Sequence, residues 1–200
     1  MQSVEDKILT SLKKSGRGIA FTPVRFAHYG SASAVQKAIE RLNEAGQIIR
    51  VARSVYCYPK IETELGLGVI YPTFDEIALC LANRDRTLIA PAGAYAVNKL
   101  GLNTQVPMNA VYVTNGEGRK VEIRNGRSII FKHAAPKTFA FESSFAQLVF
   151  IALKEIGKEN LSQEQIATLK QILKQQPRIS EMDLKLMPAW VKKLITELYE

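Results

Sequence analysis

The sequence predicts an α+β protein of two domains, and three observations support this. Composition is ordinary for a globular chain, since 46% of the 200 residues are hydrophobic and 23% are charged. Helical periodicity at both ends of the chain brackets a middle stretch of short β-rich runs. Positive charge is concentrated near the N-terminus. Residues 1–61 hold ten basic and four acidic side chains, and their net charge of +6 makes up most of the chain's net charge of +8. We therefore expect a basic domain at 1–61, a linker at about 62–71 and a larger, nearly neutral domain at 72–200.

The first expected helix is amphipathic and runs from Val4 to Ser15. Ser3 is suited to cap it, with Asp6 at the third helical position. Glycines at 16 and 18 end the helix. The following residues, 19–21, form a short β-like piece that we expect to pair with a later ribbon.

Two more helices follow, separated by a tight turn. Thr22-Pro23 opens a short helix that Tyr29-Gly30 breaks. Either Ser31 or Ser33 can cap the next one, and Gln36 completes a capping-box pattern with Ser33. A buried stripe at helical spacing is expected from Val35, Ala38, Ile39 and Leu42.

A basic two-stranded ribbon is expected directly after this helix. Residues 48–51 and 55–58 are β-rich, and residues 52–54 join them. Helix, tight turn, helix and ribbon, in this order, are typical of a winged helix-turn-helix.

In a winged helix-turn-helix, the N-terminal part of the second helix of the turn enters the major groove, and the wing contacts the backbone. The side chains expected to contact base edges are Ser31, Ser33, Gln36 and Lys37. Those suited to phosphates are Arg50, Arg53, Lys13, Lys14, Arg17 and Arg25. The sequence therefore favours binding to double-stranded DNA. A solvated charge surface, or a winged helix used for protein contact, remains the alternative.

The second domain is expected to pack helices on antiparallel strands. A capping-box pattern at 73–76 starts a helix, residues 87–90 form a buried strand, and a helix is expected from Pro91 to Gly101. Three strands follow at 111–114, 120–124 and 128–133, and Asn125-Gly126 is a strong hairpin signal between the last two. An antiparallel meander is the expected result. Helices are expected at 143–157, 163–175, 183–187 and 189–199.

Several function classes find no support in the sequence. No apolar run approaches the roughly 18 residues of a membrane span, and no export signal opens the chain, so we expect a cytoplasmic protein without membrane contact. Cys57 and Cys80 are expected to be buried free thiols. His28 and His133 are the only histidines and lie far from any ligand cluster. We expect no enzyme activity, no cofactor and no metal; a nuclease subunit is disfavoured because no acidic cluster could hold Mg²⁺.

Two segments resemble the AbiEi-type antitoxin and transcriptional-regulator family of type IV toxin–antitoxin systems. One is the wing from Arg53 to Pro59, and the other is the run from Pro91 to Pro107, whose Gly-Leu-x-Thr-Gln-x-Pro pattern is the most specific part. The likeness covers about residues 1–140. It implies an N-terminal domain that binds operator DNA and represses its own operon. It also implies a C-terminal domain that counteracts a cognate nucleotidyltransferase-like toxin.

The same resemblance makes Asn98, Thr104 and Gln105 candidates for binding that partner. The alternative is that their loop only locks the preceding helix onto the sheet. A stand-alone regulator or protein-interaction module without a toxin also stays open, because the helices after Pro177 do not map onto the family. The oligomeric state is not predicted by the sequence.

Overall fold

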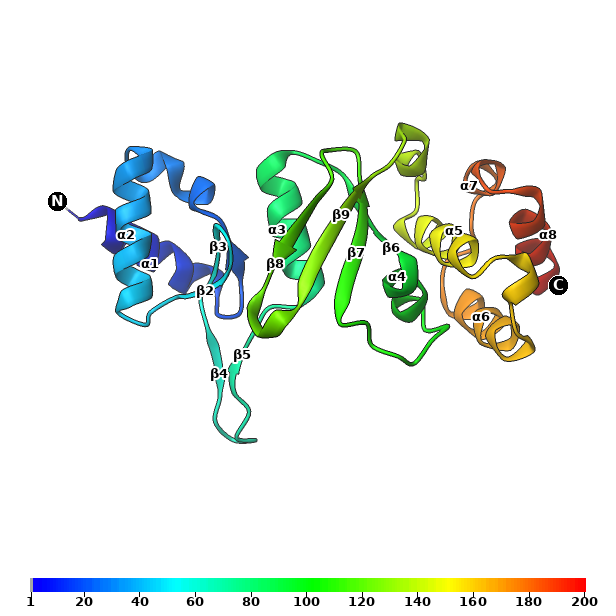
Figure 1. Cartoon of the computed structure of the whole chain (residues 1–200), viewed down its shortest axis with the longest axis horizontal. Coiled ribbons are helices and arrows are strands. Elements are labelled where there is room, and N and C mark those ends of the chain that lie inside the picture. The colour runs from blue at the N-terminus through cyan, green and yellow to red at the C-terminus, as the bar shows by residue number, and fades with distance from the viewer. Residues whose placement is uncertain (1) are drawn as a thin grey trace. The chain divides into compact units, whose positions relative to one another are not determined.

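The computed structural model describes residues 2–200 and has an α+β fold (Figure 1). Backbone contacts divide the chain into two compact units. The first comprises the residues up to Thr87 together with Val121–Arg127, and the second comprises Leu88–Lys120 together with Ser128–Glu200. The predicted domain limits, 1–61 and 72–200, differ from these contact-based units and stay a prediction.

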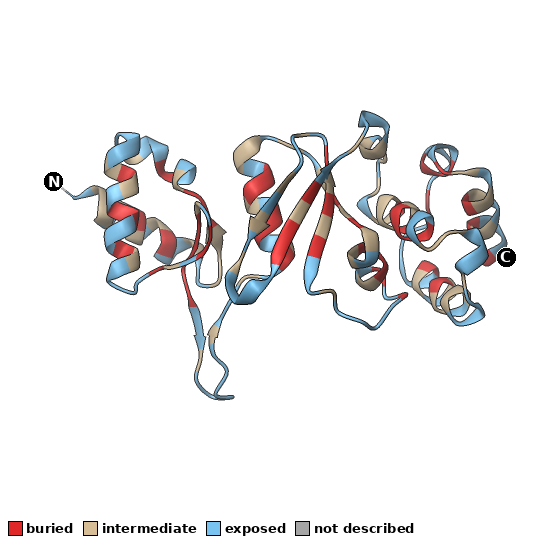
Figure 2. Cartoon of the chain, viewed as in Figure 1, coloured by how far each residue is buried: buried red, intermediate tan, exposed pale blue. Residues whose placement is uncertain are grey.

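The N-terminal part of the first unit is a cluster of helices around one core. It comprises α1 (Val4–Ser15), the 3-10 helix η1 (Pro23–Tyr29) and α2 (Ala32–Glu44). Ser3 and Asp6 form the predicted capping box, with the Asp6 N–H 3.1 Å from Ser3 Oγ. Figure 2 shows buried residues on α1 and α2. The largest fully buried side chains here are Ile8, Leu12, Phe21, Phe26, Ile39, Leu42 and Ile48.

The tight turn between η1 and α2 depends on the small size of Gly30. The backbone of Gly30 is extended, with φ of 170°, so a side chain would not strain it. A Cβ there would instead lie 3.2 Å from Cγ2 of Val4 on α1. Glycine therefore permits the turn to approach α1 closely.

A three-stranded antiparallel sheet lies beside these helices. Its strands are β1 (Ala20–Phe21), β2 (Ile49–Ala52) and β3 (Val55–Cys57), in the order β1-β3-β2. The predicted pairing of the 19–21 piece with the ribbon is thus confirmed, with Ala20 opposite Cys57. Residues 53 and 54 turn the ribbon, and Ser54 takes a left-handed φ of 60° to do so.

Residues 60–70 form a hairpin, although the sequence analysis expected an irregular linker. The strands β4 (Lys60–Glu62) and β5 (Gly68–Ile70) pair antiparallel. Leu65 and Leu67, in the connecting loop, are 76% and 63% exposed. Each strand has only three residues, which is too short for alternation to reveal it.

The remainder of the first unit comprises α3 (Phe74–Asp85) and a turn from a distant part of the sequence. Thr73 and Glu76 form the predicted capping box of α3, which packs against β1 and β3. The 3-10 turn η2 (Arg124–Gly126) brings Ile123 into a bridge with Ala52 of β2. The guanidinium of Arg127 lies over the ring of Phe74, 4.0 Å from its centroid.

A four-stranded mixed sheet follows the order β6-β7-β9-β8, which corrects the predicted antiparallel meander. Its strands are β6 (Ile89–Ala92), β7 (Asn109–Thr114), β8 (Arg119–Glu122) and β9 (Ser128–His133). β6 pairs antiparallel with β7, but β7 and β9 are parallel neighbours.

The turn after β7 explains this order, because it crosses the end of β9 and leaves β8 outside. A Cβ at Gly118 would lie only 3.3 Å from the carbonyl oxygen of Phe131 in β9. His133 Nδ1 lies 2.9 Å from the carbonyl oxygen of Gly116. The predicted tight turn at Asn125-Gly126 is present, with φ of 63° and 69°.

Helices cover the sheet of the second unit and build its core. α4 (Gly93–Lys99) and α5 (Ser144–Ile156) pack against β6, and α4 also against β7. The predicted helix start at Pro91 is wrong: Pro91 lies in β6, opposite Tyr112. β6 is an edge strand, which tolerates a proline because one side needs no ladder hydrogen bond.

Short 3-10 turns and three helices complete the chain. They are η3 (Pro136–Phe139), η4 (Lys158–Asn160), α6 (Gln163–Gln175), α7 (Glu181–Leu186) and α8 (Ala189–Leu198). The buried carboxylate of Asp183 accepts hydrogen bonds from the N–H groups of Glu142 (2.8 Å) and Ser143 (3.2 Å), at the start of α5. This contact ties α7 to α5. Among the described residues, no helix is long and apolar enough to cross a bilayer.

Candidate nucleic-acid interface

Helix α2 presents one buried and one exposed face. Ser31 is its N-cap, since the side-chain oxygen accepts the Ala34 N–H at 3.3 Å. The predicted stripe Val35, Ala38, Ile39 and Leu42 is buried. On the opposite face Ser33, Lys37, Glu40 and Arg41 are exposed. The predicted capping box of Ser33 with Gln36 does not form, because the helix already begins after Ser31.

Gln36 is engaged within α2. Its Nε2 donates to Oε1 of Glu40 at 2.8 Å, one helical turn later. To contact an adenine edge through its Nε2, the Gln36 side chain must break this hydrogen bond. Its Oε1 can accept a hydrogen bond while the bond to Glu40 is kept. Lys37, the neighbouring candidate, is exposed.

The ribbon contributes two exposed arginines. Arg50 lies in β2 opposite Tyr56, and its Nε donates to the carbonyl oxygen of Ala52 at 3.4 Å. Arg53 lies at the turn of the ribbon and is exposed. Both guanidinium groups retain free donors for an anionic partner.

Side chains of α2 and of the ribbon line one shared hollow of about 340 Å³. Its lining residues are Gln36, Glu40, Asn43, Glu44, Arg50, Arg53, Ser54 and Tyr56. The structure therefore brings together three of the predicted DNA-contacting residues, from elements that are separated in the sequence. Two glutamates share the hollow with the two arginines, and within residues 2–200 no ion pair joins them. The local charge is balanced rather than strongly positive.

Arg17 and Arg25 already have partners in the first unit. Arg17 donates to the carbonyl oxygen of Pro59 at 3.0 Å and lies 4.9 Å from the centroid of the Tyr58 ring. Arg25 donates to Ser15 Oγ at 2.6 Å. These contacts give both arginines a structural role, whichever ligand the surface has.

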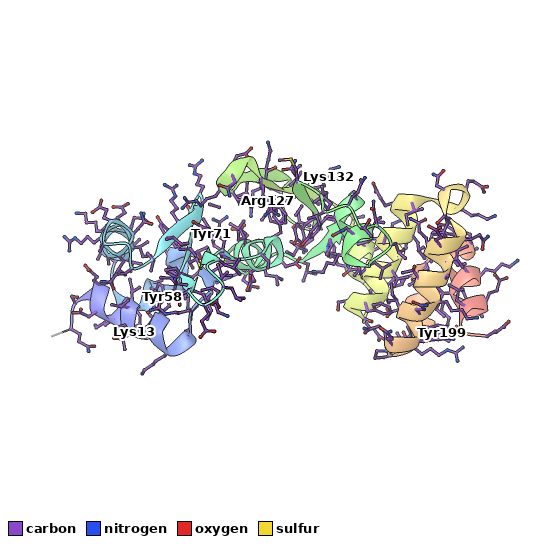
Figure 3. The ribbon with its side chains drawn as sticks, turned by 90° about the horizontal axis from the view of Figure 1, so that it is seen from below. Lys13, Tyr58, Tyr71, Arg127, Lys132 and Tyr199 are labelled. Carbon is purple, nitrogen blue, oxygen red and sulfur yellow. The ribbon has the colours of Figure 1, made fainter. Side chains whose placement is uncertain are left out.

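Lys13 and Lys14 are exposed in the last turn of α1, where positive charge also stabilises the helix end. Figure 3 labels Lys13 at this end of the molecule. Lys14 lines a second hollow, of about 410 Å³, between α1 and η1. Lys7, which the sequence analysis did not select, lines it too, together with His28. Its spacing of seven residues from Lys14 places both on one helix face, and this spacing could have identified it.

Asn98, Thr104 and Gln105 are close to one another in the second unit. The Nδ2 of Asn98 donates to the carbonyl oxygens of Asn103 and Gln105, each at 2.9 Å. Asn98 therefore ties the 103–105 loop to the end of α4. The side chains of Thr104 and Gln105 are exposed beside Val106, which is 76% exposed.

The two cysteines differ in their surroundings. Cys57 is fully buried in β3, and burial, with a smaller effect of Glu76, raises its thiol pKa to about 11. Cys80 on α3 is half-buried, and its thiol pKa is raised. Burial is the main cause of this rise, and the positive charges of Arg84 and Arg25 partly oppose it. Burial is thus confirmed for Cys57 and partial for Cys80. Across residues 2–200, no group of three or more His, Cys, Asp or Glu side chains could hold a metal ion.

The chain matches a family of unknown function, DUF6088, over residues 7–181. It belongs to this family. No curated protein matched the chain. All the candidate contact residues of α2, the ribbon and the 103–105 loop lie within the span shared with DUF6088, so the candidate interface belongs to the part of the chain that the family defines.

Proposed function

We propose that the chain is a DNA-binding transcriptional regulator whose residues up to about 61 act as a winged helix-turn-helix. The observation that carries the proposal is the shared hollow, because it joins the exposed face of α2 to the arginines of the ribbon. The order α1, β1, η1, α2, β2, β3 and the surplus of positive charge support it.

In this proposal α2 lies in the major groove and the ribbon beside it contacts the backbone. Ser31, at the N-terminus of α2, and Lys37, on its exposed face, are placed to approach base edges. Arg50 and Arg53 contact phosphates, where a planar guanidinium can bind two oxygens at once. Glu40 limits the affinity through its negative charge and holds Gln36 until DNA arrives.

We further propose that the protein represses its own promoter and acts as the antitoxin of a nucleotidyltransferase-like toxin. This part rests on the resemblance of 53–59 and 91–107 to AbiEi-type antitoxins. The exposed side chains of Thr104 and Gln105 are the contact candidates in the second unit. Co-expression with a nucleotidyltransferase encoded beside the gene should restore growth, and unchanged toxicity would contradict an antitoxin role.

The DNA-binding proposal is tested with the purified protein and two labelled duplexes. One comes from its own upstream region, and the other has the same base composition in shuffled order. A preference of about a thousandfold or more for the upstream duplex, at two salt concentrations, is the expected result. Equal, weak and salt-sensitive binding to both would show non-specific attraction only.

A further inference from the structure

Helix α8 carries two apolar stripes, of which one is fully buried and the other is only partly buried against the same core. Val191, Ile195 and Leu198 follow helical spacing and are buried in the core of the second unit. Trp190 and Leu194 form a second stripe, four residues apart, and are only half-buried. The inner part of this second stripe packs against the core, and its outer part faces solvent.

The second stripe forms a wall of an open hollow of about 480 Å³ between α8 and the start of α6. Leu161, which precedes α6, and Ile166, within it, face the hollow from the other side. The remaining lining residues are Lys158, Ala189, Lys193 and Glu197. A volume of this size lies within the usual range of small-molecule sites, roughly 300 to 1,000 Å³.

The charges at the hollow favour an anion. Lys193 is paired with Glu197 at 3.7 Å, but both side chains are largely exposed, so water weakens this pair. Lys158 has no hydrogen-bond or ion-pair partner in the described part of the chain. Lys158 and Lys193, against Glu197 alone, give the charged residues that line the hollow a net positive charge.

We propose that this hollow binds a small carboxylate with an apolar body. The apolar body covers Trp190, Leu194 and Ile166, and the carboxylate meets Lys158 and Lys193.

Trp190 allows binding to be measured directly, because it is the only tryptophan in the chain. A ligand that displaces water from the indole should shift its emission to shorter wavelength. Decanoate is the probe, titrated below its micelle concentration into the full-length protein, and decanol is the uncharged control. We expect a saturable shift with decanoate, and weaker binding of decanol because it lacks the carboxylate.

Variants of the lysines test the role of the charge. Lys158→Ala and Lys193→Ala should each weaken decanoate binding about two- to fivefold, the usual range for an exposed charge pair, and leave decanol binding unchanged. Glu197→Gln should strengthen decanoate binding, because it removes the competing acid. Lys185→Ala, at an exposed lysine of α7 outside the hollow, is the matched control and should have no effect.

All four substitutions are at exposed positions, so the variants should fold normally, and thermal unfolding of each variant is the check. An emission that decanoate does not shift would overturn the proposal. Equal affinity for decanoate and decanol, or lysine variants that bind decanoate as the original protein does, would also overturn it.

Discussion

Gln36 and Glu40 form a pair on the exposed face of α2, and DNA would have to act on that pair. The hydrogen bond of 2.8 Å keeps the Gln36 amide on the helix surface. The Glu40 carboxylate is exposed, so it would lie close to phosphates in any complex that uses this face. Repulsion between this carboxylate and the phosphates weakens binding to every sequence.

Glu40→Gln should therefore strengthen DNA binding on upstream and shuffled duplexes alike, on the order of threefold to tenfold at low salt. The gain should shrink as salt rises, because ions screen the charge. Fluorescence anisotropy with both duplexes measures it. Glu117→Gln, at an exposed acid in a turn of the second unit, is the control and should change little. Unchanged affinity for Glu40→Gln would place this face away from DNA.

Burial controls the ionisation of the Cys57 thiol. A thiol pKa of about 11 leaves on the order of one thiolate in a thousand at pH 8, so the folded protein should protect Cys57 from thiol reagents. The unfolded chain ionises near the usual value of 9.0, below the folded pKa. Burial of the neutral thiol is therefore stabilising below pH 9, and this contribution is lost as the pH rises toward 11.

Cys57→Ala isolates that contribution. The difference in free energy of unfolding between the original protein and the variant should be constant from pH 7 to 8.5 and then shrink as the pH rises toward 11. Denaturant unfolding at each pH measures it. Cys80→Ala is the control with a half-buried thiol and should show a smaller change. A difference that grows with pH would contradict a buried, neutral Cys57.

At the scale of elements, local signals predicted several features that depend on neighbours in the sequence, although the capping box expected for Ser33 and Gln36 does not form. The capping boxes at Ser3 and Thr73, and the turn at Asn125-Gly126, were predictable because each involves residues at most three positions apart. The order of the strands was not, because it depends on the 115–118 turn, which places β8 beside β9 and not beside β7. Pro91 illustrates the same limit, since it suits both a helix start and an edge strand.

The start of α2 offers a test with a matched control. Ser31→Ala removes the side-chain acceptor for the Ala34 N–H and should lower the free energy of unfolding by about 1 kcal/mol. Ser33→Ala removes a hydroxyl that lies 3.2 Å from Ser31 Oγ but accepts no backbone N–H of the helix, so it should cost less than Ser31→Ala. Thermal or denaturant unfolding distinguishes them. Equal losses for both would mean that Ser31 is not the cap.

For the whole molecule, the predicted contact residues come from separate elements, and the sequence alone did not show which of them lie together. Charge and element order selected Gln36, Arg50 and Arg53, and the structure places all three around one hollow. Sequence reasoning could not foresee the intramolecular contacts of Arg17 and Arg25, because their partners Pro59 and Ser15 are set by packing. It also missed the hollow beside Trp190, whose two walls come from separate helices.

The most direct test of the account compares Lys37→Ala with Arg53→Ala on upstream and shuffled duplexes across a salt series. Lys37→Ala should lose about tenfold or more on the upstream duplex and far less on the shuffled one, as expected for a contact to a base. Arg53→Ala should weaken both duplexes equally and reduce the slope of log affinity against log salt by about one, as expected for a phosphate contact. Equal losses on the two duplexes for both variants would contradict the division of roles between α2 and the ribbon.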